Sequence, residues 1–437
     1  MLSILKNRTY RYLFFAQIVA LVGTGIATVA LGLLAFNLAG ANAGAVLGTA
    51  LAIKMCAYVC IAPVASAMTE RFPRRAMLVV LDVVRAAIAI LLPFVTEIWQ
   101  VYVLIFLLQS ASAAFTPTFQ ATIPDILPDE KDYTRALSLS RLAYDLESLV
   151  SPILAAAMLA FISFHSLFAA TAIGFAISSM LVLSVVLPSP KPAQKRGIYD
   201  RTTRGIRIYL ATPRLRGLLA INLAVAAAGA LVIVNTVVYV QGAYALDNQA
   251  TALALAAFGG GSMLAALALP RLLETLADRT VMLAGALVLA AGTFMATTLP
   301  GYGWLLVLWF VLGLGYSTAQ TPSGRLLRRS AHAEDRPSLF AAQFALSHLC
   351  WLGAYSLAGW AGAVFGLPVA AGLLAALASI ALATALVVWP ASEPQIVEHR
   401  HDNLPPDHPH LADATPGYRH AHAYVIDDLH AVWPRQG

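Results

Sequence analysis

The segment from Ser189 to Arg216, "SPKPAQKRGIYDRTTRGIRIYLATPRLR", divides this chain into two long stretches of apolar sequence. It contains eight Lys or Arg residues and a single acid, Asp200. The sequence on either side consists of apolar runs separated by short loops. A basic break between two apolar halves predicts a membrane protein of two related units, with the break as the linker on the positively charged side.

The composition supports this prediction over a set of soluble domains. Hydrophobic residues make up 59% of the 437 residues and charged residues only 11%, whereas soluble domains contain about 25% charged residues. The formal net charge of +6 lies mostly in loops between apolar runs, so it predicts membrane orientation and no binding of nucleic acid. The cysteines Cys56, Cys60 and Cys350 lie within apolar runs and offer no disulfide framework.

Twelve runs are long enough to cross a membrane, because a spanning helix needs about 20 mostly apolar residues. The loops that follow the even-numbered runs hold most of the Lys and Arg residues, which predicts that both termini are cytoplasmic. The twelve expected spans are 11–38, 44–68, 76–95, 99–121, 139–162, 166–188, 217–243, 250–270, 280–299, 302–321, 339–363 and 367–390.

The expected organisation is an all-α membrane protein in four parts. Two bundles of six transmembrane helices are joined by a basic cytoplasmic linker and followed by a flexible His-rich cytoplasmic tail. These parts are residues 1–188 (first bundle), 189–216 (linker), 217–390 (second bundle) and 391–437 (tail).

Four segments resemble the major facilitator superfamily, and within it the twelve-helix bacterial efflux proteins that export drugs or siderophores. The loop "SAMTERFPRR" (66–75) is similar to the family's G-x-x-x-D-R-x-x-R-R motif, with Ser66 in place of the glycine. The other segments are "FTPTFQATIPDILP" (115–128), "TRGIRIYLATPRLRGLL" (203–219) and "RLLRRSAHAEDRPSLFAAQF" (325–344). The resemblance implies alternating access in a bacterial inner membrane. Its Gly-Pro-rich antiporter motif is reduced here to "SPILAAA" (151–157), and its span-4 arginine is absent.

A gating group is expected at the cytoplasmic end of the first bundle. The resemblance implies that the loop motif holds one conformation through charge contacts, although its arginines also serve as topology charges. Asp82 and Arg85 lie three residues apart on one helix face and are expected to form an ion pair. The candidate gating residues are Glu70, Arg71, Arg74, Arg75, Asp82 and Arg85.

Ionisable groups at membrane depth are the candidates for transport and coupling, because burying a charge there costs several kcal/mol (about 3 on insertion scales). Lys54 lies mid-span, with snorkelling or structural pairing as the alternative. Asp145 is expected to pair with Arg141, whereas Glu147 has no local partner. Either acid is a candidate proton carrier; the alternative is that both are interfacial charges near the cytoplasmic side. The resemblance implies that His348 approaches Lys54 between the bundles; a simple helix contact is the alternative.

No Walker loop, H-E-x-x-H motif or nucleophile elbow occurs, so neither an ATP-driven pump nor an enzyme is predicted. We expect no cofactor beyond a proton gradient. The expected partners are membrane lipid and a small-molecule or metal-ion substrate, with the protein acting as a monomer.

Seven of the ten histidines lie in residues 391–437. Imidazole and carboxylate groups suit Ni²⁺, Co²⁺ or Zn²⁺, and the tail resembles the His-rich C-terminal extensions of bacterial nickel-resistance exporters. Six histidines form H-x-H pairs and are the candidate metal ligands: His399, His401, His408, His410, His420 and His422. The alternative is a flexible tail that binds nothing specific. The apolar residues of "HAYVIDDLHAVWP" (422–434) suggest docking on the cytoplasmic face.

The leading hypothesis is therefore proton-driven efflux of a divalent transition metal such as nickel. The alternative is a multidrug or siderophore exporter of amphipathic organic compounds, for which the tail would be dispensable.

Overall fold

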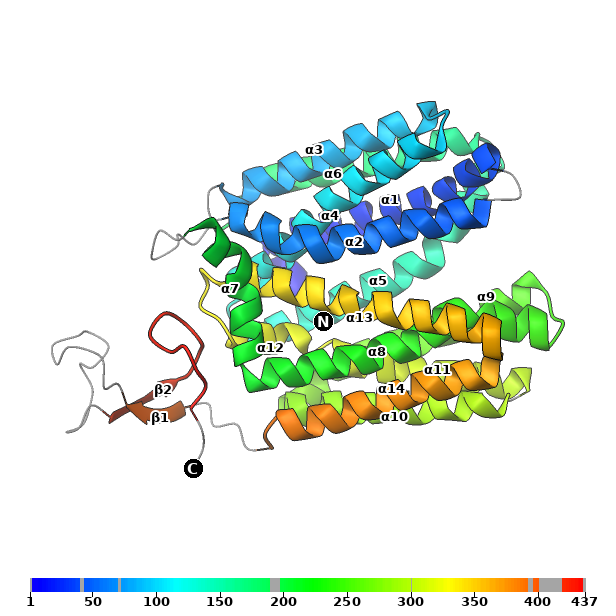
Figure 1. Ribbon diagram of the computed structural model, residues 1–437. Coiled ribbons are helices and arrows are strands. Elements are labelled where there is room, and N and C mark those ends of the chain that lie inside the picture. The colour runs from blue at the N-terminus through cyan, green and yellow to red at the C-terminus, as the bar shows by residue number, and fades with distance from the viewer. Residues whose placement is uncertain are drawn as a thin grey trace.

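The computed structural model describes residues 2–39, 43–69, 72–188, 197–299, 301–391, 396–400 and 419–434. Twelve long helices form two bundles, which lie one above the other in Figure 1. The first bundle contains α1 (Arg8–Ala39), α2 (Ala43–Thr69), α3 (Arg74–Leu91), α4 (Ile98–Ile126), α5 (Glu130–Leu159) and α6 (Phe164–Leu183). The second contains α8 (Pro213–Val237), α9 (Asn248–Thr275), α10 (Asp278–Met295), α11 (Tyr302–Gln320), α13 (Arg336–Phe365) and α14 (Leu367–Val388).

The all-α fold with twelve long helices in two six-helix bundles is confirmed, and each long helix overlaps one predicted run. Among the described residues, ten helices are long and apolar enough to cross a membrane. The largest difference is at α5, which begins at Glu130 and not at residue 139. Asp129 caps this helix, because its carboxylate accepts a hydrogen bond from the backbone N–H of Asp132 at 3.0 Å. Counting apolar residues alone missed this polar first part of the helix.

Two short helices lie at one end of the bundles. The predicted linker contains α7 (Ile198–Ala211), and α12 (Ser323–Arg329) precedes α13. Helix α7 packs closely on α13, since a Cβ atom at Gly205 would overlap the backbone carbonyl of Ser338. In Figure 1 the bundle ribbons lie closer together at this end than at the other. We call it the basic end; its described connections are 72–73, 127–129, 184–188, 197–212, 276–277 and 321–335.

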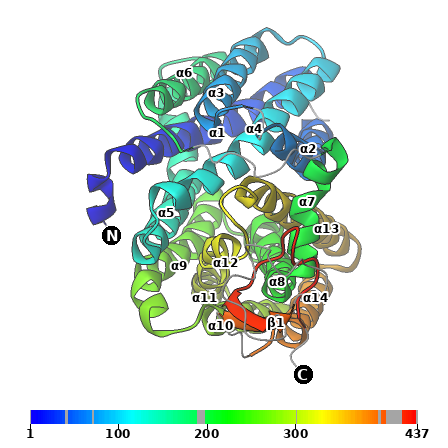
Figure 2. The same cartoon turned by 90° about the vertical axis from the view of Figure 1, so that its left-hand side faces the viewer.

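Part of the predicted flexible tail forms a two-stranded antiparallel sheet on the basic end (Figure 2). Strand β1 (Ile396–Arg400) pairs with β2 (Arg419–Ala423), and Val397 lies opposite His422. Val397, Tyr424 and Ile426 are buried in the same hydrophobic core as the second bundle. We name the described residues 396–400 and 419–434 the C-terminal cap. The expected docking of 422–434 is confirmed, because its apolar side chains are buried on the second bundle. The docked segment consists of a strand and extended chain and not of a helix.

Candidate transport and gating site

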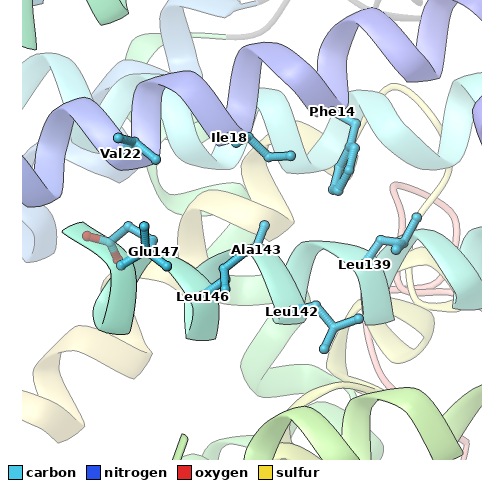
Figure 3. Close-up of a pocket in the computed structure, with 9 residues that line it drawn as sticks. Phe14, Ile18, Val22, Leu139, Leu142, Ala143, Leu146 and Glu147 are labelled. Carbon is cyan, nitrogen blue, oxygen red and sulfur yellow. The ribbon is translucent and has the colours of Figure 1, made fainter. Parts of the chain in front are cut away.

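An apolar groove of about 150 Å³ lies between α1 and α5. Figure 3 shows the two helices facing each other across it, with Phe14, Ile18 and Val22 on α1. Glu147 on α5 is the only charged side chain among the nine described residues that line the groove. Such a wall favours the apolar part of a ligand and offers one carboxyl group for a proton or a basic nitrogen.

Glu147 lies where α1 and α5 pack closely together at Gly25. A Cβ atom at Gly25 of α1 would overlap the Glu147 carboxylate and the Ser151 side chain. Ser151 is fully buried. The small residues that this close packing requires therefore come from both helices, which compensates for the reduced glycine content of "SPILAAA".

Lys54 and His348 meet the same tyrosine between the bundles. The Lys54 Nζ atom lies 5.6 Å from the centre of the Tyr58 ring, and the His348 ring contacts the edge of that ring at a centroid distance of 4.7 Å. Tyr58 donates a hydrogen bond to Gln109 of α4 at 2.8 Å. The charge of Lys54 also acts on Glu147 and on His348. The expected approach of Lys54 and His348 is confirmed; their roles in transport stay predictions.

Asp145 belongs to a polar contact that joins the two bundles. It pairs with Arg141, as the spacing predicted, and accepts a hydrogen bond from Ser262 of α9 at 2.6 Å. Arg141 donates to Gln320 of α11 at 3.2 Å, and its guanidinium lies 4.5 Å from the Tyr316 ring centre. We name these five residues the central latch: Arg141, Asp145, Ser262, Tyr316 and Gln320.

Asp82 and Arg85 form their predicted ion pair, but inside the first bundle and not between the bundles. Both are almost fully buried. Asp82 accepts a hydrogen bond from Ser178 of α6 at 2.7 Å, and Arg85 stacks over Phe115 at 4.0 Å. Their contacts therefore hold α3 to α4 and α6.

The basic end is closed by ion pairs that cross between the bundles. Asp125 of α4 binds Arg74 of α3 at 2.6 Å and also binds Arg336 of α13. Glu130 of α5 binds Arg325 at 2.7 Å. These and the neighbouring pairs form the gate: Arg74, Asp125, Glu130, Asp278, Arg325, Arg329 and Arg336.

Among the predicted gating residues, Arg74 binds Asp125, and this carboxylate also binds Arg336 of the second bundle. Arg75 donates a hydrogen bond to the carbonyl of Leu183 within the first bundle. Glu70 and Arg71 lie outside the described residues.

Replacing Asp125 by Asn should open the basic end. The change leaves Arg74 and Arg336 facing each other without their shared carboxylate, and removing one partner of a buried pair costs about 3–5 kcal/mol. We expect amide hydrogen exchange in peptides covering 121–136 and 325–340 to accelerate at least about tenfold. Asp200→Asn, which breaks an exposed pair with Arg207, is the control. Unchanged exchange in the Asp125 variant would rule out a gating role for this carboxylate.

Two of the predicted metal ligands meet in the cap. The side chains of His399 and His422 lie beside each other, joined by His430, which was not predicted. His420 lies on β2 with its Cα opposite that of His399. His401, His408 and His410 lie outside the described residues.

The cap contacts the loop between α12 and α13. Asp427 forms a hydrogen-bonded pair with His332 at 3.4 Å, which raises the pKa of His332. Burial opposes the charge of Asp427, but hydrogen bonds from His332 and His430 outweigh it and hold the pKa of that carboxyl below its usual range. Asp428 binds Arg204 of α7 at 2.7 Å.

Residues whose partners lie far away along the chain could not be predicted from local spacing. Asp125 and Arg336 are 211 positions apart, and local spacing holds no signal for such a contact. Some signal did exist, since both lie in segments that carry the family resemblance, "FTPTFQATIPDILP" and "RLLRRSAHAEDRPSLFAAQF". His430 stands outside any H-x-H pair, so H-x-H spacing does not indicate it.

Comparisons with known proteins agree with this geometry. The family model described as Major Facilitator Superfamily matches residues 13–239 and 218–416, one match for each half. The Uncharacterized MFS-type transporter YfiS of Bacillus subtilis (strain 168) is 24% identical over 162 residues, which cover 36% of this chain and 39% of the relative. Macrolide efflux protein A of Enterococcus faecalis is 25% identical over 136 residues, 30% of this chain and 42% of the relative. The chain thus spans about two fifths of the length of either relative.

Solved structures share the fold. A bacterial homologue of the iron transporter ferroportin, in an outward-facing state, has a TM-score of 0.72 at 14% identity, covering 87% of this chain and 98% of that chain. The human organic anion transporter MFSD10 (TETRAN) has a TM-score of 0.71 at 12% identity, covering 86% of this chain and 99% of that chain. Because the family model matches both halves and most of their length, this chain belongs to the Major Facilitator Superfamily.

Proposed function

We propose that this transporter exports an amphipathic organic compound from the cytoplasm in exchange for protons, with Glu147 as the proton carrier. The observation that supports this most is the groove between α1 and α5, whose wall is apolar except for the Glu147 carboxyl group. The partial similarity to Macrolide efflux protein A supports the same class of substrate.

The coupling step follows from the cost of burying a charge. When the bundles rock to close over Glu147, an ionised carboxylate would be trapped in a medium of low dielectric constant, so the switch favours a neutral or paired carboxyl group. A proton taken up from the outside neutralises Glu147 and allows return to the cytoplasm-facing state. There the proton leaves, and a basic amphipathic compound takes its place against the carboxylate.

Alternating access also requires a seal that can open and a contact about which the two bundles can move. The gate and the central latch supply these. With the gate closed, the cytoplasmic side is sealed by ion pairs that must break before the basic end opens. The latch is the contact between α5, α9 and α11 about which the bundles move. Lys54, which lies beside Tyr58 between the bundles, supplies a positive charge that acts on Glu147.

Export of a divalent transition metal such as nickel is the second candidate, supported by the three histidines of the cap. Within the described ranges no other group of three or more His, Cys, Asp or Glu ligand atoms is gathered closely enough for an ion, and this one lies outside the spans. A transported metal ion needs ligands along its path. The organic substrate is therefore the better supported proposal.

Growth and accumulation assays in a sensitive host separate the two candidates. Cells that express the protein should accumulate less of several amphipathic basic dyes, and this should persist in a His399→Ala/His422→Ala/His430→Ala variant. Collapse of the proton gradient should remove the effect. Protection against Ni²⁺, Co²⁺ or Zn²⁺ alone, lost in the triple variant, would overturn the organic substrate in favour of the metal.

A further inference from the structure

Three histidine rings from different parts of the C-terminal cap meet at one point. Ligand atoms of His399, His422 and His430 all lie within 4.8 Å of one another, and the ring centroids are 4.7, 4.9 and 5.1 Å apart. His430 is only 3% exposed. We propose that these histidines form a regulatory site for a divalent transition metal, whose binding holds the cap against the closed gate. This goes beyond the proposed export function, since the metal is a ligand of the cap and not the cargo.

The sheet register and one turn create the cluster. Val397 lies opposite His422 and His399 opposite His420, so His399 and His422 are diagonal neighbours on one face of the sheet. The chain then passes through the buried residues Tyr424 and Ile426. A turn in which Asp427 N–H donates to the carbonyl of His430 at 3.2 Å returns His430 to the pair.

Hydrogen bonds prepare each ring to bind a metal. The Nδ1 atom of His430 lies 2.8 Å from the Asp427 carboxylate, that of His399 lies 3.0 Å from the carbonyl of Val397, and that of His422 lies 2.9 Å from the carbonyl of Ala423. An oxygen acceptor requires a proton on Nδ1, which leaves the Nε2 lone pair as the ligand. Metal-binding histidines almost always donate their other N–H to a carboxylate or carbonyl in this way.

Two of these Nε2 atoms face each other. They belong to His399 and His430 and lie 3.0 Å apart. With a proton on each Nδ1, two neutral rings would bring two lone pairs together, so this contact needs a cation between the rings or an extra proton on one of them. Two nitrogen ligands of a tetrahedral Zn²⁺ with bonds of about 2.05 Å lie about 3.3 Å apart. A bound ion would therefore fit with a small outward movement of the two rings.

The ligand set selects the class of metal. Three neutral imidazoles suit Zn²⁺, Ni²⁺, Co²⁺ or Cu²⁺, whereas Mg²⁺ and Ca²⁺ prefer oxygen ligands. The Asp427 carboxylate is fixed in place, because its Oδ1 atom also accepts the backbone N–H groups of Leu429 and His430 at 2.9 and 2.8 Å. It orients His430 and increases the basicity of its ring.

The same carboxylate links the site to the gate. Its other oxygen, Oδ2, faces His332 in the loop between α12 and α13. The neighbouring Asp428 binds Arg204, which holds Asp335 through hydrogen bonds of 2.5 and 2.8 Å. Asp335 directly precedes Arg336, a member of the gate. The cap is thus attached, directly and through Arg204, to the loop that connects α12 and α13, the two helices that bring gate arginines to the first bundle.

Metal binding should therefore favour the docked cap and, through it, the closed basic end. A ligand that binds only one of two states shifts the equilibrium toward that state by a factor that grows with the ratio of its free concentration to its Kd, about 100-fold at 100 times its Kd. The three ligands meet only when the strands are paired and the turn is formed. Metal binding and cap docking are then linked.

The binding test uses purified full-length protein in detergent, with Co²⁺ absorption spectra and Zn²⁺ competition as readouts. We expect one high-affinity ion per chain, lost in the His399→Ala/His422→Ala/His430→Ala variant and retained in His165→Ala, which alters an exposed histidine outside the cap. A His401→Ala/His408→Ala/His410→Ala variant removes as many histidines from the same tail. If that variant loses the ion while the first one keeps it, the proposed site is wrong.

Two milder variants test the site if the triple variant undocks the cap. His422→Ala removes one half-buried ligand, and Asp427→Asn keeps the ring of His430 but weakens its orientation, which should lower Zn²⁺ affinity about 10–100-fold. In the wild type, Zn²⁺ should slow hydrogen exchange in peptides covering 325–340 and 419–434. Exchange that is unchanged by Zn²⁺ in 325–340 would overturn the link to the gate, whatever compound the protein transports.

Discussion

Replacing Glu147 by Gln is expected to abolish uphill export while leaving downhill exchange of the substrate measurable at raised substrate concentration, because the apolar wall of the groove still binds the compound. Glutamine has nearly the same size and keeps the close packing against Gly25 and Ser151. It cannot take up or release a proton. A transporter that no longer needs protonation to close can still equilibrate its substrate, but the proton gradient no longer drives it.

The size of the effect follows from the cost of the charge. An ionised carboxyl group at membrane depth costs about 3 kcal/mol on insertion scales, and 1.4 kcal/mol corresponds to a tenfold change in an equilibrium. Neutralisation therefore changes the balance between the two conformations by roughly 100-fold. We expect the concentration gradient of substrate that the variant sustains in proteoliposomes with an imposed pH difference to fall to background.

The measurement compares pH-driven accumulation with counterflow in the same vesicles. Glu274→Gln, at an exposed position near the basic end of α9, is the matched control and should behave as the wild type. Accumulation by the Glu147 variant at the wild-type level would remove this residue as the proton carrier. Loss of both accumulation and counterflow would instead indicate a structural or substrate-binding role.

The sequence was sufficient to predict the membrane helices, because each is an apolar run of about 20 residues and most of the apolar surface must face lipid or another helix. It also predicted two short-range ion pairs. Asp82 and Arg85 are three residues apart and Arg141 and Asp145 are four apart, so the helix itself brings their side chains together.

The parts of the site that join the two bundles could not be obtained in this way. Whether an ion pair lies within or between bundles depends on how the helices cross. The pair of Asp82 and Arg85 proved internal, whereas that of Arg141 and Asp145 reaches Ser262 and Gln320 in the second bundle. The spacing of three or four residues along a helix is the same kind of signal for both pairs, so it does not show which pair joins the two bundles.

The tail shows a similar limit. H-x-H spacing identified histidines of suitable chemistry, but the cluster takes one histidine from each of two such pairs and a third from outside them. That combination depends on the pairing of β1 with β2 and on the turn at Asp427. Both are set by the burial of Val397, Tyr424 and Ile426 on the second bundle. The apolar residues of 422–434 predicted docking, but not which histidines the docked chain brings together.

Neutralising Asp145 in the central latch should strongly lower the stability of the protein. Asp145→Asn leaves the Arg141 guanidinium with Ser262, Gln320 and the Tyr316 ring but no anion. The side chain of Arg141 is only 16% exposed. Removing one partner of a buried ion pair costs about 3–5 kcal/mol. We expect a clearly lower unfolding temperature in detergent, together with loss of transport, because the described contact between α5, α9 and α11 is weakened.

A double-mutant cycle separates two contributions to the loss of stability: the lost attraction between Arg141 and Asp145, and the cost of leaving the Arg141 charge buried without an anion. Arg141→Gln/Asp145→Asn removes both charges and should recover most of the unfolding temperature, since a neutral pair can still hydrogen-bond with Ser262 and Gln320.

Arg135 and Asp132 form a pair on the same helix with side chains 33% and 41% exposed. Asp132→Asn is therefore the control and should cost less than about 1 kcal/mol. Equal effects of Asp145→Asn and Asp132→Asn would contradict a buried latch. If the double variant were stable but could not transport, the charges of Arg141 and Asp145 would be required for the movement of the bundles and not for their assembly.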